Sequence, residues 1–137
     1  MSKIAIIYWS GTGNTEAMAS CLESAAKGAG AEVVTMTPDA VGSLTDYTAV
    51  ALGCPSMGAE VLEESEFEPM WQGIKDSLSG KKIGLFGSYG WGDGEWMRNW
   101  VDEAEGSNLN VVGNVICQES PDGTAQDELA ALATALV

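Results

Sequence analysis

The chain of 137 residues contains no histidine, few basic residues and no long apolar run. The absence of histidine excludes Ser–His and Cys–His catalytic pairs and most zinc sites. Six lysines and arginines stand against 20 aspartates and glutamates, a formal net charge of −14. That balance argues against nucleic acid or an anionic membrane as a partner. No apolar run approaches the roughly 18 residues of a membrane span.

Cysteine is also scarce, since the chain has only Cys21, Cys54 and Cys117 and no CxxC pair. This spacing favours free thiols in a reducing compartment over disulfides or a metal site. The amino terminus, MSKIAIIYWS, is too short in apolar length for a signal peptide and leads directly into a predicted strand. We therefore expect a cytoplasmic protein without a metal site.

Five short segments rich in β-branched and apolar residues predict strands. Hydrophobic residues make up 45% of the chain, enough for a core, and runs such as IAIIYW are typical of strands covered on both faces. The predicted strands are Lys3–Trp9, Glu32–Thr37, Tyr47–Cys54, Lys82–Ser88 and Asn110–Cys117.

Helical periodicity separates these strands. Helices are predicted at Asn14–Ala29, Glu64–Leu78, Gly94–Glu105 and Thr124–Leu136, and Pro38–Asp46 has room for one helical turn. Trp96 and Trp100 recur at helical spacing, which favours packing in the core. The alternation predicts an α/β fold, a doubly wound five-stranded parallel sheet in the order 2-1-3-4-5, as one domain.

Ligands of such sheets bind beyond the carboxyl ends of the strands, where the order switches. The loops predicted at that edge are Ser10–Thr15, Pro55–Glu60 and Tyr89–Asp93. A solvated connector would favour charged residues, but these loops are rich in Gly, Ser, Thr, Met and aromatic residues. We therefore expect a ligand site between them.

The first loop, SGTGNT, has the composition of an anion site without a cation. Ser, Thr and Asn side chains supply donors, glycine lets the backbone approach an anion, and the following helix adds free N–H groups and its dipole. The loop lacks the lysine of a Walker A motif. Glu16 takes the third glycine position of G-x-G-x-x-G, so a dinucleotide site is disfavoured.

The other two loops suit a planar ring. Trp91 stands on a glycine-rich frame, where its indole would either stack on a heteroaromatic ring or turn into the core. Met57 would pack on the opposite face of that ring, and Glu60 would accept a hydrogen bond from a ring N–H. An anion site in the first loop and a ring site between the other two loops together indicate a mononucleotide with an extended linker.

The segments SGTGNTE, GCPSMGAE and GLFGSYGWGDGEW together resemble the short-chain flavodoxins, over essentially the whole chain. The resemblance implies a flavodoxin-like FMN-binding domain over residues 1–137, with FMN held non-covalently. It implies a low-potential one-electron carrier, not an enzyme, that shuttles mainly between semiquinone and hydroquinone. Its partners would be redox proteins with basic docking surfaces, and the chain would be a monomer.

The resemblance also assigns roles by motif position. It assigns the first loop to the phosphate, Met57 and Trp91 to the two flanks of the ring, and Glu60 to the ring N3–H. The segment around Gln118 and Glu119 matches no motif and is left out of the site. The expected cofactor-binding residues are Ser10, Gly11, Thr12, Gly13, Asn14, Thr15, Pro55, Ser56, Met57, Gly58, Ala59, Glu60, Ser88, Tyr89, Gly90, Trp91 and Gly92.

In flavodoxins the peptide at the position of Gly58 rotates toward N5–H of the reduced flavin. A type II′ turn over Met57–Glu60 would place Gly58 at the first central position, which demands a positive φ that glycine permits. Ala59 offers no polar side chain to tune that rotation.

Two other protein classes fit parts of the pattern. A response-regulator receiver shares the strand order, but needs an aspartate where strand 3 ends in Gly53–Cys54 and a lysine where strand 5 ends in Cys117–Gln118. An FMN-dependent NAD(P)H or quinone reductase would need a further pocket, for which 137 residues leave little room. A low-molecular-weight phosphatase is excluded, because the first loop has neither Cys nor Arg.

Overall fold

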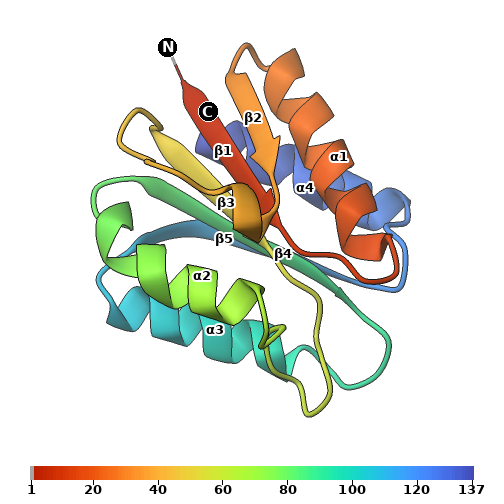
Figure 1. Cartoon of the computed structure of the whole chain (residues 1–137). Coiled ribbons are helices and arrows are strands. Elements are labelled where there is room, and N and C mark those ends of the chain that lie inside the picture. Colours follow the sequence, from red (N-terminus) through yellow and green to blue (C-terminus); the bar gives the residue numbers. More distant parts are fainter. Residues whose placement is uncertain (1) are drawn as a thin grey trace.

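The computed structural model describes residues 2–137, and Met1 lies outside the described part. Residues 2–137 form a five-stranded parallel sheet in the order β2-β1-β3-β4-β5, as predicted (Figure 1). The strands are β1 Lys3–Tyr8, β2 Glu32–Met36, β3 Ala49–Gly53, β4 Lys82–Tyr89 and β5 Asn110–Gln118.

Helices cover both faces of the sheet, α1 and α4 on one and α2 and α3 on the other (Figure 1). The helices are α1 Asn14–Gly28, α2 Phe67–Ile74, α3 Glu95–Gly106 and α4 Gly123–Leu136. Two short 3₁₀ turns, η1 Pro38–Ala40 and η2 Lys75–Leu78, complete the connections, η1 being the single turn expected there. Within residues 2–137 no helix has both the length and the apolar character needed to cross a bilayer.

The sheet separates two apolar cores, as the nearly continuous apolar strands predicted. Trp96 and Trp100 are each only 2% exposed, which confirms their expected place in the core. Trp100 meets Phe67 and Trp71 edge-on, with ring centroids 5.4 and 6.0 Å apart. Trp91 is 64% exposed, so it does not turn into the core.

Most predicted boundaries lie within one residue of the observed ones, and two predicted elements were too long. Strand β3 begins at Ala49 because the Tyr47 N–H donates to the Leu44 carbonyl and closes a turn there. Helix α2 begins at Phe67 because the carboxylate of Glu63 binds the preceding backbone N–H groups. Gly30, shortly after the end of α1, has a φ of +95°, as is usual for a glycine that terminates a helix.

Candidate functional site

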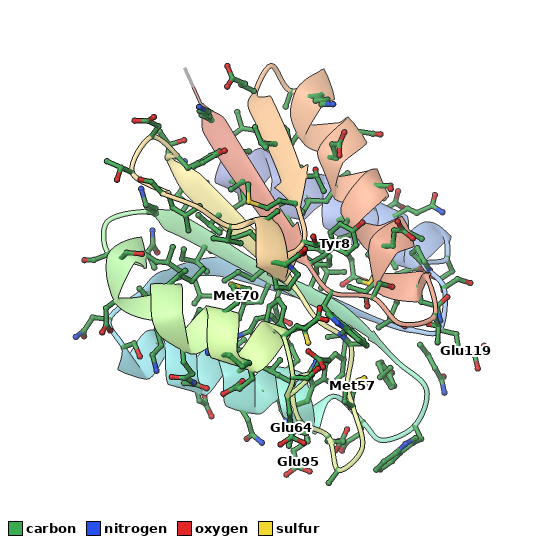
Figure 2. The ribbon with its side chains drawn as sticks, in the orientation of Figure 1. Tyr8, Met57, Glu64, Met70, Glu95 and Glu119 are labelled. Atoms are coloured by element: carbon green, nitrogen blue, oxygen red, sulfur yellow. The ribbon has the colours of Figure 1, made fainter. Side chains whose placement is uncertain are left out.

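A cavity of about 390 Å³ opens at the carboxyl edge of the sheet. All three predicted loops contribute to it, so the fold brings together segments that lie far apart in the sequence. The lining residues are Trp9, Gly11, Thr12, Asn14, Pro55, Ser56, Met57, Ser88, Tyr89, Gly90 and Glu119. Figure 2 shows Met57 and Glu119 at this edge, on two different connections.

The first loop is folded around the hydroxyl of Ser10. Its Oγ accepts hydrogen bonds from the N–H groups of Gly13 at 3.1 Å and Glu16 at 3.3 Å. Gly13, with φ +95°, turns the chain into α1. Within residues 2–137 the N–H groups of Asn14 and Thr15 have no partner, as expected for a first helical turn. The helix dipole favours an anion at this point.

Three residues predicted in the first loop, Ser10, Gly13 and Thr15, are not among those that line the cavity. Thr15 is 1% exposed, and its Oγ1 accepts a hydrogen bond from the Ser88 N–H at 3.4 Å. These three residues therefore shape the loop, while Gly11, Thr12 and Asn14 face the cavity.

The second loop carries a turn that is one residue longer than predicted. Met57 and Val61 exchange both backbone hydrogen bonds, at 2.9 and 3.0 Å, so Val61 and not Glu60 closes the turn. Gly58 has the positive φ expected of it, +49°. Glu60 also has a positive φ, +56°, which is uncommon for a residue with a side chain and explains the extra residue.

Glu60 carries an unsatisfied acceptor. Its Oε1 is buried and has no hydrogen-bond partner within residues 2–137. The same oxygen lies against Gly92, where an added Cβ would come within 2.2 Å of it. Gly92 therefore lets the Glu60 carboxylate lie against the third loop, and its φ of +89° also favours glycine. A buried carboxylate oxygen without a donor is costly, and an N–H from a ligand would satisfy it.

The third loop is held at its far end by the chain's single arginine. Arg98 donates to both the backbone carbonyl and the carboxylate of Asp93, each at 3.0 Å. Gly92 and Gly94 have φ of +89° and +94°, so the loop folds back sharply on both sides of Asp93. Trp91 projects from this loop into solvent, with its indole free to meet a ligand or a partner.

The acidic run between the second loop and α2 contains one carboxylate with a structural task. Glu63 is 6% exposed and accepts from the N–H groups of Glu66 and Phe67 at 2.8 Å, and from both the N–H and the hydroxyl of Ser65. Burial alone would raise the pKa of the Glu63 carboxyl. These hydrogen bonds outweigh burial and lower that pKa to about 2.

Sequence reasoning missed two lining residues, Trp9 and Glu119. Trp9 follows β1 directly and could have been found from its place at the carboxyl edge. Glu119 follows β5 in the same way, but nothing in the sequence indicates its backbone conformation. It has a φ of +60°, and two of the three hydrogen bonds to its backbone come from Ser88 and Tyr89 in β4.

The comparisons with known proteins agree with this geometry. The family model described as flavodoxin matches residues 6–132. The chain belongs to the flavodoxin family. It is 47% identical over 125 residues to flavodoxin from Megasphaera elsdenii, covering 90% of this chain and 91% of the relative. It is also 47% identical to flavodoxin from Clostridium beijerinckii, covering 89% and 91%.

A solved structure supports the same assignment. The solution structure of two-electron reduced Megasphaera elsdenii flavodoxin superposes with a TM-score of 0.88 at 45% identity, covering 95% of this chain and 97% of that one. Flavodoxins contain FMN and carry electrons at low potential, so the chain is an electron carrier for redox protein partners and not an enzyme. The receiver and reductase interpretations are thereby set aside.

The residues at the cavity of this flavodoxin fit FMN. The first loop brings Thr12, Asn14 and a helix start to the cavity, and neutral donors of this kind fit a phosphate. Glu60 does not line this cavity but a second one, with Val61 and Trp96, and its unpartnered oxygen fits a ring N–H. When bound, FMN supplies the one-electron chemistry. The protein's part is to bind the cofactor and orient it.

Proposed function

We propose that residues 1–137 act as one FMN-binding domain that holds the phosphate in the loop Ser10–Thr15 and the ring between Met57 and Trp91. Backbone and side chains of the remaining predicted positions would complete the site. The observation that carries this proposal is the buried, unpartnered Oε1 of Glu60 in the turn that begins at Met57, since that oxygen needs the donor that a flavin ring supplies.

Glu60→Gln tests this role. We expect the FMN dissociation constant to rise about tenfold, because a charge-assisted hydrogen bond becomes a weaker bond to a neutral amide oxygen. Removing a negative charge would by itself tighten binding of a phosphate dianion, so the direction of the change separates the two effects. Fluorescence titration with FMN measures it. Glu64→Gln, at an exposed neighbouring residue, is the control and should change the constant less than about twofold. Equal effects of both substitutions would contradict the assignment.

We further propose that partners dock at the carboxyl edge through basic surfaces. The lysines are segregated, since they stand at strand starts and helix ends on the opposite edge. They are Lys3, Lys27, Lys75, Lys81 and Lys82. At the carboxyl edge Arg98 pairs with Asp93, while Glu64 stands on the connection into α2 and Glu95 at the start of α3 (Figure 2).

Electron transfer from the reduced, FMN-loaded chain to a small basic acceptor protein should therefore depend on salt. We expect the second-order rate constant to fall about tenfold as the ionic strength rises from ~0.02 M to ~0.3 M. Stopped-flow absorbance measures it. The same acceptor with its lysines acetylated is the control and should lose this salt dependence. A rate that is insensitive to salt with both acceptors would refute basic docking.

We infer a monomer in the cytoplasm. Large exposed hydrophobic side chains within residues 2–137 are confined to Val34, Val61 and Trp91, too few for an extensive interface. The three cysteines are free thiols, as in a reducing compartment. Light scattering should give the monomer mass of 14.3 kDa, and a dimer mass would contradict this inference.

A further inference from the structure

Ser88 connects the segments that surround the cavity. It is 4% exposed, near the end of β4. Its N–H donates to Thr15 Oγ1 in the first helical turn at 3.4 Å, and its carbonyl accepts from the Ser56 N–H in the second loop at 3.0 Å. Its hydroxyl donates to the carbonyl of Glu119, after β5, at 2.5 Å. Each polar group of Ser88 therefore holds a different segment.

Glu119 needs this support, because its backbone is in the left-handed region with a φ of +60°. For a residue with a Cβ that conformation is unfavourable and persists only where the surroundings fix it. The Glu119 N–H donates to the Tyr89 carbonyl at 2.9 Å, and its carbonyl accepts from Ser88 Oγ and from Cys117 Sγ. Two of the three bonds come from adjacent residues at the end of β4.

We propose that Ser88 is a positioning residue for the flavin, and that it acts by holding Glu119 in the left-handed conformation that forms the fourth side of the cavity. This proposal rests on the proposed FMN site. It differs from the role predicted by motif position, because the Ser88 hydroxyl would contribute through Glu119 and not by touching the cofactor. Glu119 would thereby join the three loops as part of the binding site.

Hydrogen exchange in the flavin-free chain tests the link between Ser88 and Glu119 without the cofactor. Ser88→Ala keeps both backbone bonds of residue 88 and removes only the hydroxyl. We expect the amide of Glu119 to exchange about fivefold faster. The matched control is Ser107→Ala at the opposite edge of the sheet, which removes a similar bond from a hydroxyl to the Glu103 carbonyl at 3.0 Å. It should leave the exchange rate of the Glu119 amide unchanged. An unchanged exchange rate in Ser88→Ala would overturn the proposal.

A double-mutant cycle on FMN affinity tests the consequence. Ser88→Ala should raise the FMN dissociation constant about fivefold in the native background. In a Glu119→Gly background the left-handed conformation no longer depends on the hydroxyl, so Ser88→Ala should change the constant less than about twofold. In Glu119→Gln, which keeps the Cβ and removes only the charge, the fivefold effect should persist.

The outcomes are distinguishable. If Ser88→Ala weakens FMN equally in the native and Glu119→Gly backgrounds, the hydroxyl contacts the flavin directly and the positioning role is wrong. If Ser88→Ala leaves FMN affinity unchanged in the native chain, the role is also wrong. If the native chain itself does not bind FMN, the proposed function fails, while hydrogen exchange still decides the link between Ser88 and Glu119.

Discussion

Replacing Glu63 by alanine should lower the free energy of unfolding by about 3 kcal/mol at neutral pH. The carboxylate is buried and accepts four hydrogen bonds from three successive residues, which begin α2 at Phe67. Without it, several backbone N–H groups next to a closed core lose their acceptor. Urea titration followed by tryptophan fluorescence measures the change. Glu64→Ala, at the exposed neighbour, should cost less than about 0.5 kcal/mol. Similar losses in both variants would contradict a specific role for Glu63.

The same carboxylate gives the stability a defined dependence on pH. Its pKa is lowered from 4.5 to about 2 in the folded chain, so the unfolded chain binds the proton more readily. The contribution of Glu63 is therefore fully present above pH 4.5 and is lost as the pH falls from there through about 2. The difference in unfolding free energy between the native chain and Glu63→Gln should shrink across that window. A difference that is constant with pH would contradict the lowered pKa.

The strand order and the three loops could be predicted because they depend on local patterns. Buried parallel strands are continuously apolar, and helices between them repeat with a period of 3.6, so the alternation alone implied the sheet and its ligand edge. The place of the loop Ser10–Thr15 at the cavity could be predicted because it directly follows a strand at that edge. Trp91 was readable because a large indole on a glycine-rich loop needs a reason to stay exposed.

Residues whose conformation depends on distant segments could not be predicted. Glu119 is left-handed because Ser88 and Tyr89, about 30 positions earlier, bind both of its backbone groups. The turn closed by Val61 likewise has an extra residue because Glu60 adopts a φ of +56°. Glutamate rarely adopts a positive φ, so the residue type did not indicate this conformation. Both positions belong to the edge where the cofactor is expected, and departures from local preference are most frequent at functional sites.

The roles of the carboxylates between Glu60 and Glu68 could not be predicted from the sequence either. These five carboxylates look alike in the sequence, yet Oε1 of Glu60 is buried without a partner within residues 2–137, while Glu63 is saturated with hydrogen bonds. Glu64 remains exposed. One carboxylate is therefore available to a ligand, one stabilises a helix start and others supply surface charge. Tertiary structure alone separates these tasks.

We propose that a chain with a net charge of −14 holds a phosphate without a cation. The first loop supports it with an open helix start and with Thr12 and Asn14 at the cavity. Hydrogen bonds to a charged group contribute about 1.5–3 kcal/mol each. The phosphate would be held and would not react, so neutral donors would suffice without a lysine. Two such bonds would make the phosphate worth at least about a hundredfold in affinity.

Titration of the flavin-free chain with FMN and with riboflavin, which has the same ring but no phosphate, measures this contribution directly. We expect FMN to bind with 1:1 stoichiometry and riboflavin to bind at least about a hundredfold more weakly. Near-equal dissociation constants for the two flavins would contradict phosphate binding by the loop Ser10–Thr15, because all of the binding free energy would then come from the ring.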